Sequence, residues 1–81
     1  MSNLINVGFG NIVNADKIIA VVMSDSAPAK RLMQNAKREG CAIDATHGRK
    51  VKSVLIMENS QLVFSALLPE TILGRFQGTD S

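Results

Sequence analysis

The sequence predicts a small α+β domain in which a mostly antiparallel sheet is combined with two helices. Short β-branched stretches separated by turn residues run through the chain, one central segment repeats apolar residues at helical spacing, and a Pro-Glu pair opens a second apolar segment near the end. At 81 residues the chain has room for one domain, because a compact core uses most of a chain this short. We therefore expect residues 1–81 to form a single domain, with residues 78–81 as a flexible tail.

The first half of the chain predicts three strands. Residues 4–7 and 12–13 lie on either side of Gly8-Phe9-Gly10-Asn11, which indicates two short strands joined by a glycine turn or bulge. The third strand, from Lys17 to Met23, is strongly β-branched. A phosphate-binding loop would need its glycines between a strand and a helix. Because a strand follows here, we interpret the glycines as structural.

A helix over residues 27–39 is the best-defined element. Ser26 can cap its start, Pro28 suits its first turn, and Gly40 stands where a left-handed C-terminal cap would end it. The apolar residues recur on one face of this helix: Ala29, Leu32, Met33 and Ala36. The basic residues fall on its other faces: Lys30, Arg31, Lys37 and Arg38. Charge alone makes these basic residues typical of an ordinary solvated helix face.

The second half of the chain predicts three more strands and a short helix. The strands are expected at residues 42–45, 51–57 and 62–68, with turns at residues 46–50 and 58–61. The pair Pro69-Glu70 then opens a terminal helix. Its apolar face would contain Ile72, Leu73 and Phe76.

Composition predicts that the chain associates with itself. Hydrophobic residues make up 46% of it and aromatic residues 4%, and a domain of this size is marginally stable without a disulfide, a metal or a partner subunit. The single cysteine, Cys41, cannot form an internal disulfide, and with the single histidine it supplies too few ligands for a zinc site. We expect a homo-oligomer with its surplus apolar surface in the subunit interfaces, and no metal or cofactor.

The chain carries no signal for a membrane or for export. The longest wholly apolar run, from Ile18 to Met23, is far shorter than the roughly 20 residues that cross a bilayer. The N-terminus lacks a basic segment followed by an apolar stretch and a cleavage site. We therefore expect a cytoplasmic protein without a membrane partner.

Few residues in the sequence are suited to catalysis. His47 lies near Asp44, but a turn flanked by glycine and arginine is poorly built to exclude water, and paired carboxylates are missing from its vicinity. Cys41 is interpreted as a small packed residue. We expect no enzymatic activity and see no indication of a small-molecule ligand.

The basic residues are more informative. Arg49, Lys50 and Lys52 lie within four positions, and no acidic residue occurs between Ala45 and Met57. Arginine can bind phosphate oxygens through its planar fork, and lysines add point charges. The alternative is that such cations in a hairpin turn only keep a solvated edge from aggregating. Charge alone does not decide between the two.

Four blocks, in order, span nearly the whole chain: Asn6-Val7-Gly8-Phe9-Gly10-Asn11-Ile12-Val13, then Ser26-Ala27-Pro28 with Lys30-Arg31, then Ile43-Asp44-Ala45-Thr46 with Gly48-Arg49-Lys50, and Pro69-Glu70-Thr71. Together they resemble the RemA family of bacterial extracellular-matrix regulators. The resemblance implies a transcriptional regulator that binds promoter DNA of biofilm-matrix operons. It also implies assembly into a ring of subunits with basic residues around its outer side, acting on the nucleoid in the cytoplasm.

The resemblance also implies which residues contact double-stranded DNA. The family's contact positions are held here by Lys17, Arg49 and Lys50. We add Lys52, which lies close to Arg49 and Lys50 of the basic turn, residues 46–50. Lysine stands at two positions where the family has arginine, so phosphate binding should persist while bidentate groove contacts weaken. One alternative is a ring-forming scaffold whose basic rim binds an acidic protein partner. RNA binding is less favoured because the chain has no Trp or Tyr for base stacking.

Overall fold

The computed structural model describes residues 4–76, so the predicted tail at residues 78–81 lies outside the described residues. The elements are β1 (Leu4–Asn6), β2 (Ile12–Asn14), the 3-10 helix η1 (Ala15–Lys17), β3 (Ile18–Met23), α1 (Ala27–Glu39), β4 (Ala42–Asp44), β5 (Ser53–Met57), β6 (Leu62–Ser65) and α2 (Pro69–Phe76). The predicted α+β class with two helices is confirmed.

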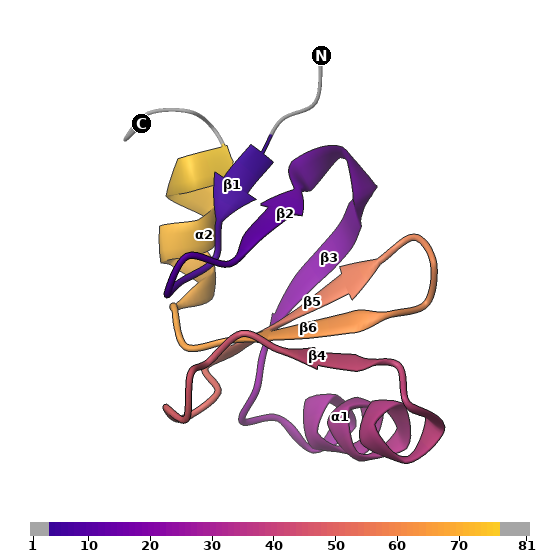
Figure 1. The fold of residues 1–81 in the computed structure, drawn as a ribbon. Coiled ribbons are helices and arrows are strands. Elements are labelled where there is room, and N and C mark those ends of the chain that lie inside the picture. The colour runs from indigo at the N-terminus through magenta and orange to yellow at the C-terminus, as the bar shows by residue number, and fades with distance from the viewer. Residues whose placement is uncertain (1–3, 77–81) are drawn as a thin grey trace.

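Two sheets make up the β structure of residues 4–76. Strands β1 and β2 form an antiparallel hairpin, and the other four strands form a sheet in the order β3-β5-β6-β4. The pairs β3–β5 and β5–β6 are antiparallel, whereas β4 runs parallel to β6. The larger sheet lies between α1 on one side and the β1–β2 hairpin with α2 on the other (Figure 1).

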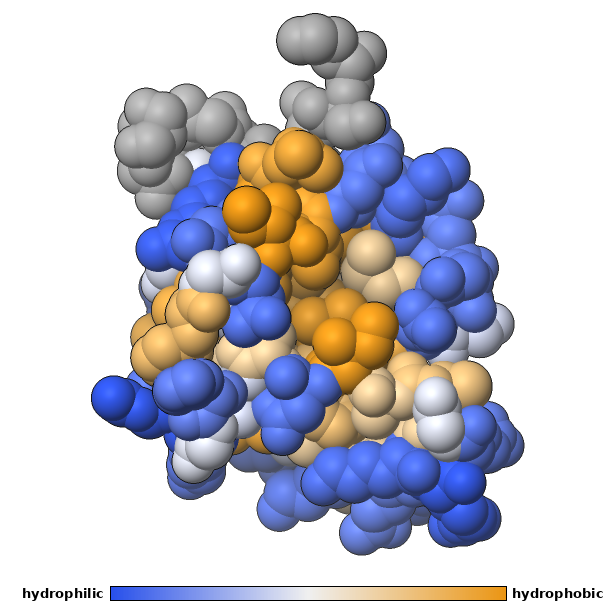
Figure 2. Space-filling view, viewed as in Figure 1, coloured by the Kyte–Doolittle hydropathy of each residue, from blue (hydrophilic) through white to orange (hydrophobic). Residues whose placement is uncertain are grey.

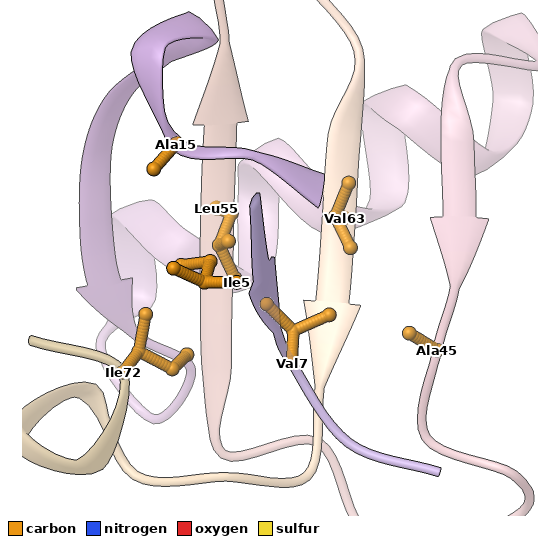
Figure 3. Packing of buried hydrophobic residues seen from close by; sticks show 7 residues of the cluster. All are labelled: Ile5, Val7, Ala15, Ala45, Leu55, Val63 and Ile72. Atoms are coloured by element: carbon orange, nitrogen blue, oxygen red, sulfur yellow. The ribbon is translucent and has the colours of Figure 1, made fainter. Parts of the chain in front are cut away.

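This layering buries both faces of the central strands. Val54 pairs with Phe64 across β5 and β6, and Leu55 pairs with Val63. The first pair belongs to a core cluster under α1, and the second pair belongs to a cluster under the hairpin and α2, drawn in Figure 3. Burial on both faces explains why these strands are nearly continuous apolar runs in the sequence.

The central helix begins and ends as predicted. The Ser26 hydroxyl accepts a hydrogen bond from the Ala29 amide at 3.2 Å, and Gly40 caps the C-terminus with a φ of 75°. The expected packing of Cys41 is also found, since it lies half-buried against the cluster under α1. Neither α1 nor α2, the α-helices of residues 4–76, has the length and apolar character needed to cross a membrane.

Several predicted strand ends are wrong. Lys17 ends η1 instead of opening β3, because Asn14 caps a short 3-10 turn by accepting from the Asp16 amide at 3.0 Å. Strand β5 begins at Ser53, two positions after the predicted start at Val51. Strand β6 ends at Ser65 and does not reach Leu68, because the chain turns toward α2 there.

Candidate nucleic-acid interface

The loop between β1 and β2 is a tight hairpin turn with an aromatic residue at its tip. The Asn11 amide donates to the Gly8 carbonyl at 3.0 Å. The two residues between them, Phe9 and Gly10, have φ angles of 55° and 79°. A positive φ at both central positions is the pattern of a type I′ turn. Phe9 remains 48% exposed.

The basic turn repeats this backbone pattern. The Arg49 amide donates to the Thr46 carbonyl at 3.0 Å. The central residues, His47 and Gly48, have φ angles of 55° and 82°. Each turn therefore places an aromatic side chain at its first central position and a glycine at its second.

Asp44 sets the start of the basic turn. Its Oδ1 accepts hydrogen bonds from the Thr46 hydroxyl at 2.6 Å and the Thr46 amide at 2.9 Å. These two bonds, the hydroxyl first, lower the pKa of the Asp44 carboxyl. Burial opposes them in part, and the charge of Lys37 lowers the pKa as well. Because Thr46 is itself buried, the turn is anchored to the body of the domain.

The two turns touch through their side chains. The rings of Phe9 and His47 stack with their centroids 5.4 Å apart and an angle of 22° between their planes. The guanidinium carbon of Arg49 lies 5.4 Å from the centre of the Phe9 ring. The Asn11 side-chain amide donates to the Gly8 carbonyl at 2.9 Å and to the Ala45 carbonyl at 3.5 Å, which links the two loops. We call the residues of both turns, 8–11 and 46–49, the paired turns.

Three of the four predicted DNA-binding residues lie at or next to the paired turns. Arg49 and Lys50 are exposed at the end of the basic turn, and Lys52 is exposed just before β5. Within residues 4–76 none of the three side chains forms an ion pair. The structure thus presents them as a solvated cationic surface, which can attract phosphate at low cost in lost protein contacts.

Lys17 lies elsewhere. Its carbonyl accepts from the Glu58 amide at 2.8 Å, and its Nζ is 3.9 Å from Glu58 Oε1 in an ion pair whose side chains are both more than half exposed. Glu58 follows the end of β5, whereas Lys52 precedes its start. At roughly 3.3 Å per residue, β5 separates the two positions by about 20 Å. One subunit therefore does not bring Lys17 together with the basic turn.

The sequence indicates a structural role for the glycines between β1 and β2, and it does not indicate the contact of this loop with the basic turn. Glycine at the second position of each turn is a visible signal of a positive φ. Phe9 is not such a signal, because bulky residues seldom adopt the left-handed region, and His47 is a weak one, because histidine adopts it more often than most residues do. Only the repeated aromatic-glycine pair, Phe9-Gly10 and His47-Gly48, was available as a signal.

Comparison with known proteins finds one matching family and a set of similar chains. A family model described as RemA-like, "Extracellular matrix regulatory protein A-like", matches residues 4–76. A protein of Lachnoclostridium phytofermentans is 57% identical over 100% of this chain and 89% of its own length. One of Microcystis aeruginosa is 52% identical over 90% of this chain and 82% of its own length. One of Geobacillus kaustophilus is 45% identical, covering 99% and 92%. All three are named as regulatory proteins.

Proposed function

This chain belongs to the RemA-like family of extracellular matrix regulatory proteins, and from that membership we propose that it regulates transcription by binding double-stranded promoter DNA of biofilm-matrix operons. The observation that carries the proposal is the exposed cationic group of Arg49, Lys50 and Lys52 at and beside an anchored turn, with no ion pair to any of the three within residues 4–76. The relatives' names support a regulatory role. In this proposed role the protein acts in the cytoplasm on the nucleoid, catalyses no reaction and uses no cofactor.

The proposed DNA binding is expected to use more than one subunit. Each neutralised phosphate contributes a slope of about −0.9 to the dependence of log affinity on log salt, so a protein with few contacts binds weakly at physiological salt. A single subunit offers the basic turn at one end of β5 and Lys17 at the other, about 20 Å away. Repeating both positions around a ring multiplies the phosphate contacts along the DNA without new contacts per subunit. Bending of the DNA around the ring then makes recognition depend on its deformability.

The structure also offers a surface for self-association. A groove of about 590 Å³ lies between β3 and α2. It is lined by Ile5, Ile18, Ile19, Ala20, Val21, Pro69, Glu70, Ile72 and Leu73. Ile19 is 64% exposed and Leu73 is 53% exposed. Hydrophobic residues also gather at the centre of the face on which the β1–β2 hairpin lies (Figure 2).

We propose that a second copy of the chain covers this groove. Strand β3 is an edge strand of the four-stranded sheet, and an apolar edge promotes uncontrolled pairing unless something covers it. A second copy also supplies the stabilisation that a chain of 81 residues with one cysteine cannot obtain from a disulfide.

Binding to promoter DNA and to random duplex across a salt series, with molecular mass measured by light scattering on the same sample, tests the proposal. We expect a mass of several subunits and a tight, steeply salt-dependent affinity that favours the promoter. An oligomeric mass without DNA binding at low salt would contradict it. That result would favour the alternative of a ring-forming scaffold whose basic rim binds an acidic protein partner, which a saturable pull-down would then identify.

A further inference from the structure

Phe9 occupies a position that neither turn geometry nor core packing explains. Its φ of 55° lies in the left-handed region, where a hairpin turn of this type normally places Asn, Asp or Gly. Its side chain is 48% exposed, and it belongs to neither of the two core clusters. A strained residue of this kind persists where the surrounding structure holds it, and such residues gather at functional sites.

The partners of Phe9 are the residues of the basic turn. Its ring stacks on His47, which has the same φ of 55°, and it lies 5.4 Å from the Arg49 guanidinium carbon. Asn11 holds the glycine loop against the basic turn through its bond to the Ala45 carbonyl. Two turns that each place an aromatic residue in the left-handed region are thus joined through those residues. The third member of the group, Arg49, is the cation best suited to phosphate.

We propose that Phe9 is a positioning residue of the DNA-binding surface, and this inference rests on the proposed function. An aromatic ring attracts a guanidinium through its π face and uses none of the N–H donors, which stay available for phosphate oxygens. A guanidinium already held in place loses less conformational freedom when it binds. Phe9 therefore raises the DNA affinity of Arg49 without contributing a charge.

Three variants of the full chain separate this role from a structural one. Phe9→Leu keeps apolar bulk and removes the π face, Phe9→Tyr keeps the π face, and Phe9→Asn suits the turn better than phenylalanine does. We expect Phe9→Leu and Phe9→Asn to weaken DNA binding by about two- to fivefold per engaged subunit, with Phe9→Tyr binding as the parent does. The salt slope should stay unchanged in all three, because no phosphate contact is lost.

A second measurement reports on the contact without DNA. In nuclear magnetic resonance spectra of the free protein, the ring current of Phe9 should shift the side-chain protons of Arg49. Phe9→Leu should abolish the shift and Phe9→Tyr should preserve it. Arg49 signals that do not respond to Phe9→Leu would overturn the proposal, and so would Phe9→Leu binding DNA as tightly as the parent. The two failures are distinguishable. If the parent itself does not bind DNA, the proposed function and this inference are both overturned, whereas a parent that binds DNA no better than Phe9→Leu overturns this inference alone.

Discussion

Asp44 accepts two hydrogen bonds from Thr46 with a single oxygen, at 2.6 Å from the hydroxyl and 2.9 Å from the amide. This Asx turn ends β4 and opens the basic turn. The position of Arg49 in space therefore depends on the hydrogen bonds of Asp44, which lies earlier in the chain.

The first prediction concerns the pH dependence of this anchor. The folded-state pKa of Asp44 lies below its ordinary value of 3.8, so its ionised form stabilises the folded state above that pH. The contribution disappears as the pH falls through the lowered pKa. Asp44→Ala should lower the thermal midpoint at pH 7, and the difference from the parent should shrink below about pH 3.8. Thermal melts at pH 7 and pH 3 check this; an equal difference at both values would contradict it.

The second prediction tests the basic turn directly. Arg49→Ala should weaken DNA binding at all sequences and reduce the salt slope by about one per engaged subunit. Arg38→Ala removes the same charge from an exposed position on α1, outside the paired turns, and serves as the matched control. Titrations of one duplex across a salt series measure both. Equal slopes for the two variants would show that net charge, and not the basic turn, drives binding.

The third prediction uses two glycines with matched geometry. Gly48 and Gly40 have φ angles of 82° and 75°, and an added Cβ would meet no atom within 4 Å at either position. Alanine at each should cost a similar amount of stability, about 1–2 kcal/mol, for the left-handed backbone alone. Only Gly48→Ala should also weaken DNA binding, because it alters the turn that carries Arg49. Chemical denaturation and DNA titration together check this, and equal DNA affinity for both variants would argue against the site.

Local signals made some of the fold predictable. The ends of the central helix were predictable because Ser26 and Pro28 act on the first turn of the helix and Gly40 acts on its last turn. The end of β6 depends instead on Ser65, whose hydroxyl donates to the Val7 carbonyl at 2.6 Å across 58 positions of sequence. A side-chain bond between such distant segments leaves no pattern in the residues near it.

The candidate site also has a part that is predictable from the sequence and a part that is not. The cationic group of Arg49, Lys50 and Lys52 was predictable because the residues are close in sequence. The stack of Phe9 on His47 was not predictable, because it joins loops from two different sheets and needs a left-handed backbone at Phe9, which bulky residues seldom adopt.

The fourth prediction tests Lys17. Because the edge of the sheet at Lys17 and the basic turn lie about 20 Å apart within one subunit, their effects on DNA binding should be independent. Lys17→Ala should reduce the salt slope, and the double variant with Arg49→Ala should lose the sum of the two reductions. The ion pair with Glu58 is exposed, so its removal should barely change stability. A salt slope that Lys17→Ala leaves unchanged would remove this residue from the binding surface.

The last prediction tests the groove between β3 and α2. Ile19 is 64% exposed, so Ile19→Glu should change the stability of an isolated subunit by no more than about 0.5 kcal/mol. Within an assembly the same carboxylate would be buried without a partner, which is strongly unfavourable. The variant should therefore have the mass of a single subunit by light scattering and should lose DNA binding at physiological salt, since its remaining cations act alone. Leu32→Glu, at a residue on α1 that is 41% exposed, is the control and should assemble normally. An Ile19→Glu variant with the parent's mass would place the subunit contact on another face of the domain.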